Sequence, residues 1–185
     1  MVMGPVINPL LDSDAALVHE ACTMLEVGEI PIEIGKLTLL EQFDCGINNF
    51  TGTIPPQIGD LKNLEILDLG LNNIGGPIPP AIFNISTLSM IDLTFNQLSG
   101  HLPSNMGLSL PNLEELYLGG NHLVGPFPMS IPNASQLVNL DMGNNYISGS
   151  IPDTLGNLRN LKSLILQFNN LTSSGMSFLS SLTRC

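Results

Sequence analysis

Side chains suited to acid–base, nucleophilic or metal chemistry are scarce in this chain, and their spacing fits no catalytic pattern. The histidines are His19, His101 and His122. They form no HExxH metal pair, and no CxxC pair begins a zinc site. Gly35 and Lys36 resemble the end of a phosphate-binding loop, but Ile30 replaces its first glycine and Leu37 its Ser or Thr. The GxSxG elbow and the kinase motifs are also absent, so we predict no enzyme activity, metal or cofactor.

The balance of charge argues against nucleic acid as a partner. Among 185 residues, 5 are Lys or Arg and 16 are Asp or Glu, which gives a formal net charge of −11. Phosphate binding needs a cluster of cations, and the sequence contains none. No apolar run approaches the roughly 18 residues that span a bilayer. The first residues also lack the basic and apolar regions of a signal peptide, so we predict neither a membrane span nor an export signal in this chain.

The composition is typical of turns that surround an apolar core. Charged residues make up 11% of the chain, whereas globular domains carry about 25%. The sequence has 18 Gly and 14 Pro. Disorder is disfavoured, because 43% of the residues are hydrophobic and the mean hydropathy is +0.29. We therefore expect a fold in which turns recur at intervals.

Asparagines at a fixed phase reveal an internal repeat. Their spacings are 24, 24, 25, 24 and 24 residues. They are Asn48, Asn72, Asn96, Asn121, Asn145 and Asn169. Each closes a pattern LxxLxLxxN, as Leu64, Leu67 and Leu69 do before Asn72. A glycine follows four residues after each of the first five asparagines, and an apolar residue and a proline come next. This period identifies a repeat protein.

Each part of the repeat predicts an element. The alternation in LxL predicts a short strand with its leucines inward, and strands that recur every 24 residues must pair in parallel. The Asn amides can satisfy backbone groups at the turns and form a ladder, while Gly permits positive φ where the chain turns. Return segments such as 58–64 predict a short helical or 3-10 turn. Cys45 is equivalent to Leu69, so we expect a buried thiol that packs as a small hydrophobe.

These motifs resemble the plant-specific leucine-rich repeat, LxxLxxLxLxxNxLxGxIPxxIGxL, over residues 27–185. That repeat is found in the ectodomains of plant receptor-like kinases, in receptor-like proteins and in polygalacturonase inhibitors. The resemblance implies an α/β right-handed solenoid shaped as a horseshoe or arc, with a parallel β-sheet on the concave face and short helical or 3-10 turns on the convex face. The tail at 171–185 resembles the interrupted repeat of the rice bacterial-resistance and bacterial-peptide receptors.

Both ends of the chain depart from a complete receptor. Residues 1–26 show no repeat, and the domain at 27–185 holds about six 24-residue repeats that are incomplete at both ends. Met24 stands where a ladder asparagine is expected. Because a solenoid normally needs polar caps, we interpret the chain as a fragment of a larger receptor. Cys22 and Cys185 lie too far apart along such a stack to pair, and either is a candidate cap cysteine.

Half of the acidic residues are expected on the concave face, around the LxL leucines. The candidate ligand-binding residues there are Glu41, Asp44, Glu65, Asp68, Asp92, Glu114, Glu115, Tyr117 and Asp141. Adjacent like charges cost stability, so one interpretation is that they await a basic ligand. The other, which we favour, is that they simply solvate the sheet.

Two further sets of residues have a fixed phase in the repeat. Residues that precede ladder asparagines, namely Ile47, Leu71, Phe95 and Phe168, form either an apolar ridge for binding or, as we expect, side-by-side contacts within the solenoid. Four sequons predict N-glycans at Asn49, Asn84, Asn133 and Asn170. Asn84 and Asn133 fall on return segments, where glycans would leave the concave face free.

Three functional hypotheses follow. The first is a non-enzymatic recognition module, part of a receptor-like kinase ectodomain in defence or developmental signalling. The resemblance implies a peptide or protein ligand, a co-receptor of the same repeat class, and a place on the extracellular side of the plasma membrane, with any kinase outside this chain. The second is a secreted inhibitor of cell-wall-degrading enzymes. The third is a truncated product without function.

Overall fold

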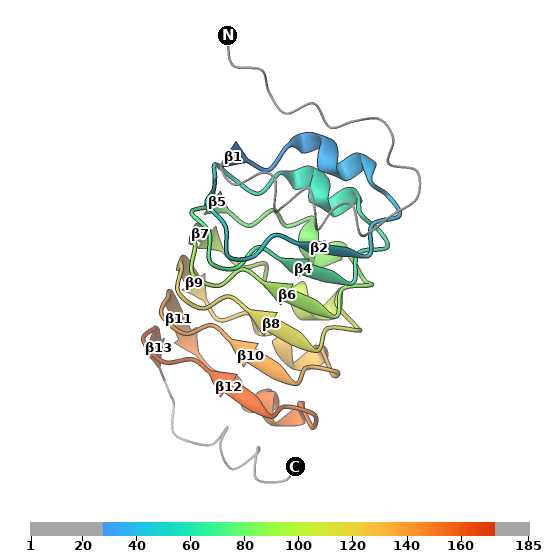
Figure 1. Cartoon of the computed structure of the whole chain (residues 1–185). Helices are drawn as coiled ribbons and strands as arrows, with labels where there is room; N and C mark the ends of the chain where they lie inside the picture. The colour runs from blue at the N-terminus through green and yellow to red at the C-terminus, as the bar shows by residue number, and fades with distance from the viewer. Residues whose placement is uncertain (1–27, 173–185) are drawn as a thin grey trace.

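The computed structural model describes residues 28–172, which form a stack of similar coils (Figure 1). Each complete coil contains a strand of one sheet, a corner, a strand or bridge on a second side, and a 3-10 helix that returns the chain. The coils follow one another from β1 and β2 at the top of Figure 1 to β12 and β13 at the bottom. Predictions that concern His19, Cys22, Met24, Cys185 and the tail beyond residue 172 lie outside the described residues.

Six parallel strands form the sheet predicted from the LxL motifs, which we call the concave sheet. They are β2 (Gln42–Asp44), β4 (Ile66–Asp68), β6 (Met90–Asp92), β8 (Glu115–Tyr117), β10 (Asn139–Asp141) and β12 (Ser163–Ile165). They pair in chain order, and equivalent positions face each other, as Leu67 faces both Phe43 and Ile91. The repeat therefore places equivalent side chains in straight columns across the sheet.

A second sheet, which the sequence analysis treated as turns, follows the ladder asparagines. Its parallel strands are β5 (Gly75–Pro77), β7 (Gln97–His101), β9 (His122–Pro126), β11 (Tyr146–Ser150) and β13 (Asn170–Thr172). In the first coils, β1 (Gly28–Glu29) pairs with β3 (Phe50–Thr51), and Thr53 bridges to Gly75. We call the five-stranded sheet of β5, β7, β9, β11 and β13 the lateral sheet. Its signal was an alternation in which Leu98, Leu123 and Ile147 point inward.

The return segments are 3-10 helices, as the sequence predicted. They are η1 (Ile32–Lys36), η2 (Pro56–Asp60), η3 (Ile82–Asn84), η4 (Met106–Leu108), η5 (Ile131–Asn133) and η6 (Asp153–Asn157). They stack behind the concave sheet (Figure 1). The helix η4 approaches η5 so closely that a Cβ on Gly107 would lie 2.1 Å from the Ser130 carbonyl oxygen. Glycine is therefore required by packing at this position.

The core is a column of aliphatic side chains between the two sheets and the 3-10 helices. Leu64, Leu67 and Leu69 of one repeat are fully buried, and their counterparts in the neighbouring coils are buried as well. Burial of this kind, at about 25 cal/mol per Å² of apolar surface, is the main favourable term for a solenoid. The leucines thus hold consecutive coils in contact.

The ladder asparagines join each coil to the one before it. The Asn72 amide donates to the Leu69 carbonyl of its own coil (3.1 Å) and to the Cys45 carbonyl of the preceding coil (3.0 Å). Its oxygen accepts from the Phe50 backbone N–H (2.9 Å). Asn96, Asn121, Asn145 and Asn169 repeat the arrangement. The predicted ladder is confirmed, and it satisfies backbone groups that would otherwise be buried without partners.

The prediction for Cys45 is partly wrong. The side chain is buried as expected, with 2% of its surface exposed. It is disulfide-bonded, however, and so is not a free thiol. The repeat pattern did not indicate a disulfide, because Cys45 occupies a leucine position whose inward direction indicated only packing.

Candidate functional site

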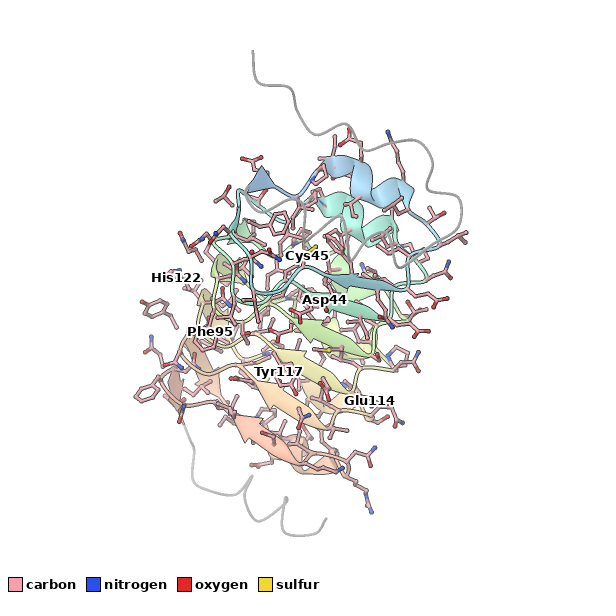
Figure 2. All side chains as sticks on the ribbon, in the orientation of Figure 1. Asp44, Cys45, Phe95, Glu114, Tyr117 and His122 are labelled. Atoms are coloured by element: carbon pink, nitrogen blue, oxygen red, sulfur yellow. The ribbon has the colours of Figure 1, made fainter. Side chains whose placement is uncertain are left out.

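The concave sheet presents the predicted acidic residues in ordered columns. One column runs Asp44, Asp68, Asp92, Tyr117, Asp141 and Ile165, and the next runs Gln42, Ile66, Met90, Glu115, Asn139 and Ser163. Glu41, Glu65 and Glu114 precede these strands and are exposed. Figure 2 shows Asp44, Tyr117 and Glu114 on this face. Strand pairing therefore brings residues from five successive repeats onto one surface.

The aspartates of the central column also hold the backbone at the strand ends. Oδ1 of Asp68 accepts the Gly70 backbone N–H at 2.9 Å, and Asp92 and Asp141 accept equivalent bonds at 2.8 Å. Asp44 makes the longest bond of this set, 3.3 Å, to the Gly46 N–H. Burial raises the pKa of Asp68, the Gly70 hydrogen bond opposes this rise, and the charges of Asp92 and Asp44 add to it.

These aspartates also explain the glycines of the motif LDLG. A Cβ on Gly46 would lie 2.9 Å from Oδ1 of Asp68, so the carboxylate of one coil rests over the glycine of the coil before it. In the coil before Tyr117, where no aspartate packs from the next coil, Thr94 replaces the glycine. Its hydroxyl donates a hydrogen bond to Asp92 of its own coil (2.7 Å). The Asp and Gly positions therefore form one structural unit. The acidic column thus contributes to the fold as well as to the surface.

Tyr117 interrupts the aspartate column. Burial raises the pKa of its phenol, and the neighbouring Glu115 adds to this increase. Asn139 on β10 donates a hydrogen bond to Oε1 of Glu115 at 3.3 Å. The three side chains thus form a polar cluster in the fourth and fifth strands, and Tyr117 places an aromatic ring between Asp92 and Asp141.

The residues that precede the ladder asparagines are largely exposed, so they do not pack into the core, although the Phe95 ring lies against Gly120 of the next coil. Exposure is 79% for Ile47, 49% for Leu71, 59% for Phe95 and 75% for Phe168. Each has a left-handed backbone, with φ between 51° and 56°. We call these four residues the apolar ridge. It follows the corner between the concave and lateral sheets, where Figure 2 shows Phe95.

The lateral sheet carries the exposed histidines His101 and His122. His101 ends β7 and His122 begins β9. The His122 ring stacks on Tyr146 of β11, with centroids 6.2 Å apart and an interplanar angle of 13°. Both rings are on the surface.

The sequon residues are also exposed, and they are Asn49, Asn84, Asn133 and Asn170. Asn49 precedes β3 and Asn170 begins β13, so these two lie on the lateral side, whereas the other two lie in η3 and η5.

A second set of polar links between coils was missed from the sequence. Asn63 donates to the Thr38 carbonyl (2.8 Å), and Asn112 donates to the Ser86 carbonyl (2.9 Å). Thr87 and Asn160 make corresponding bonds, to the Lys62 and Ser135 carbonyls. All four precede the first leucine of LxxL. An Asn or Thr recurs at this position of the repeat, and this recurrence could have predicted the second set of links from the sequence.

Within residues 28–172, no group of three or more His, Cys, Asp or Glu side chains is arranged to hold a metal ion. No helix in this range is long and apolar enough to cross a bilayer.

Comparisons with known proteins identify the family. Leucine-rich repeat family models match residues 111–171 and 63–85. The leucine-rich repeat ectodomain of the receptor kinase SOBIR1 from Arabidopsis thaliana is 33% identical with a TM-score of 0.67, and the match covers 71% of this chain and 72% of SOBIR1. The chain belongs to the leucine-rich repeat ectodomains of plant receptor kinases. The comparison with curated proteins finds no match.

Longer ectodomains of this family are also similar. The plant peptide hormone receptor RGFR1, in complex with RGF2, is 38% identical with a TM-score of 0.76 over 78% of this chain and 23% of RGFR1. Arabidopsis HAESA, in complex with the peptide hormone IDA and the co-receptor SERK1, is 30% identical with a TM-score of 0.73 over 78% of this chain and 24% of HAESA. This ectodomain chain thus spans about a quarter of these receptors' length. Its described residues are repeats throughout and include no catalytic domain.

Proposed function

We propose that this chain recognises a peptide or protein on its concave sheet. The observation that carries the proposal is the alignment of equivalent side chains across six parallel strands, which creates a continuous surface whose columns have one side chain about every 4.8 Å from strand to strand. Of the similar proteins, RGFR1 is a plant peptide hormone receptor that binds RGF2, and HAESA forms a complex with the peptide hormone IDA. Peptide recognition is therefore the function that best fits this surface.

The candidate contact residues are the exposed or half-buried acids and the tyrosine of this sheet. In the central column, each aspartate engages one oxygen with the backbone, and its other oxygen accepts no hydrogen bond from a described residue. A ligand with Lys or Arg side chains complements that surface. The local bonds mean that such a ligand would use carboxylates already held in place, which reduces the ordering cost of binding.

The test compares two charge-matched variants of the chain. Asp68→Asn with Asp92→Asn removes two concave charges and keeps an oxygen for each backbone bond, whereas Glu33→Gln with Asp60→Asn removes two charges elsewhere. The probe is a twelve-residue peptide of alternating Lys and Ser, with a Glu–Ser peptide as the negative control. We expect the concave variant to bind the Lys–Ser peptide about fivefold more weakly than the other variant. Equal affinities would contradict a ligand role for this column.

For the whole receptor, we propose a place on the extracellular side of the plasma membrane and a co-receptor of the same repeat class, in defence or developmental signalling. SERK1 is the co-receptor in the HAESA complex, which supports the proposal of a co-receptor. We also propose that the receptor belongs to a subfamily like the rice bacterial-resistance and bacterial-peptide receptors. We further propose that the leucine-rich repeat domain of this chain extends over residues 27–185.

We also propose that Asn49, Asn84, Asn133 and Asn170 carry N-glycans, since all four side chains are exposed. Intact mass measured on the plant-expressed chain, routed to the secretory pathway, tests this directly. Glycan masses that disappear from four Asn→Gln variants in turn would support it. An unmodified mass would overturn it.

A further inference from the structure

The apolar ridge combines two features that are each unfavourable for an isolated chain. Its four side chains leave about half or more of their surface in water. Their backbones are also left-handed, a conformation that costs energy for any residue with a Cβ and most for a β-branched one such as Ile47. The stack requires this corner geometry, but it does not require the residue type.

Two coils show that the fold accepts relaxed residues at the same phase. Gly120 and Asn144 occupy the equivalent corners with φ of 70° and 51°. Glycine and asparagine are the residues that tolerate this conformation best. Isoleucine, leucine and phenylalanine are therefore choices that cost stability without contributing to the core. Such a cost indicates selection for contact with something outside the chain.

The continuous part of the ridge lies beside the aspartate column. Ile47, Leu71 and Phe95 belong to three successive coils, each three residues after Asp44, Asp68 and Asp92 respectively. Next to Phe95, Gly120 leaves space that the ring fills, because a Cβ there would lie 2.7 Å from the ring. The surface is thus a strip of three coils with negative charge along one side and apolar groups along the other.

We propose that Ile47, Leu71 and Phe95 form a docking surface for the apolar side chains of a cationic peptide whose basic groups face Asp44, Asp68 and Asp92. The charge of the adjacent column selects the occupant, since an acidic or purely apolar partner would leave three carboxylates against it unpaired. This inference rests on the proposed function and adds that the ligand is amphipathic. It also assigns affinity for apolar groups to the corner residues, outside the strands.

The experiment replaces the ridge by the residue that the fold already uses at Asn144. The variant is Ile47→Asn with Leu71→Asn and Phe95→Asn in the full chain. The probes are two twelve-residue peptides of equal charge, one of alternating Lys and Leu and one of alternating Lys and Ser. The matched control is Leu108→Asn, which removes an apolar side chain that is 66% exposed at the end of η4.

We expect the wild-type chain to bind the Lys–Leu peptide about tenfold or more tightly than the Lys–Ser peptide. The ridge variant should lose that difference and bind both peptides as the wild type binds Lys–Ser. It should also melt at least about 3 °C higher, because asparagine relieves the left-handed strain. The Leu108 variant should change neither quantity.

Three results would overturn the inference. A ridge variant that keeps the full preference for Lys–Leu would show that the ridge makes no contact with the peptide. A ridge variant that melts lower than wild type would show that these side chains support the fold. Concentration-dependent self-association of the wild type that the ridge variant abolishes, measured by sedimentation, would assign the ridge to a second copy of the chain. If the first of these results occurs while the Asp68→Asn, Asp92→Asn variant loses peptide binding, the proposed function stands and only the ridge inference fails.

Discussion

At the scale of single residues, the aspartates of the concave sheet serve the fold as well as the surface. Asp68 accepts a backbone hydrogen bond from Gly70 and rests over Gly46 of the preceding coil. A carboxylate in that position is partly removed from water and faces two like charges. The hydrogen bond therefore stabilises a group whose negative charge is itself unfavourable in the folded chain.

We predict that Asp68→Asn stabilises the chain at neutral pH. The folded-state pKa of Asp68 lies above its ordinary value of 3.8, so ionisation favours the unfolded chain at pH 7. Asparagine removes that charge and keeps an oxygen for the Gly70 N–H. The gain should shrink as pH falls through the folded-state pKa and should vanish below 3.8, where the wild-type carboxyl is protonated in both states. Urea unfolding of both proteins at pH 7 and pH 3 provides the measurement, and a variant less stable than wild type at pH 7 would contradict the prediction.

At the scale of elements, the strands are too short to be stable alone. The concave strands have three residues each, and an isolated pair of such strands would not persist in water. Their stability comes from the coil below and the coil above, through aliphatic packing and the asparagine ladder. Removal of a ladder amide should therefore weaken the contact between two coils.

We predict that Asn96→Ala destabilises the chain by about 3 kcal/mol, because the Ile74 N–H and the Leu69 carbonyl lose a buried partner. Asn48→Ala is the matched control. Within the described residues, the Asn48 amide bonds only to carbonyls of its own coil, Cys45 and Gly46. Its loss should cost about 1 kcal/mol. Equal free energies of unfolding for the two variants would show that the links between coils contribute little.

At the scale of the whole molecule, the two exposed sheets differ in charge. The concave side carries eight of the 16 acidic residues of a chain whose net charge is −11. From β5 to β13, the lateral strands contain no Asp, Glu, Lys or Arg. Charge is therefore concentrated on one side of the solenoid, and it repels itself across strands that pair in register.

We predict that salt stabilises the folded chain. Raising NaCl from about 20 mM to about 500 mM shortens the screening length several-fold and weakens the repulsion among the concave carboxylates. The melting temperature should rise, and it should rise less in the variant that combines Asp68→Asn with Asp92→Asn. The variant with Glu33→Gln and Asp60→Asn should respond like wild type. An equal response in all three proteins would place the repulsion elsewhere.

The repeat, the inward leucines, the parallel concave strands, the short return turns and the asparagine ladder could all be predicted from the sequence. Each of these depends on a local pattern of residue types, and a period of 24 residues leaves parallel stacking as the way to bury them. The same pattern placed Asp44, Asp68 and Asp92 in one column. Local chemistry repeated at a fixed phase was sufficient for these features.

Features that depend on neighbouring coils or on chain direction at a corner could be seen only in the three-dimensional structure. The lateral sheet forms because the residues after Asn72 and Asn96 find partners in the next coil. Ile47 and Phe95 are exposed because the left-handed corner turns their side chains away from the core, which no hydrophobic pattern can indicate. The disulfide of Cys45 likewise depends on distance in space. Residue types fix what must be buried, but the path of the backbone fixes which of the remaining apolar groups meet water.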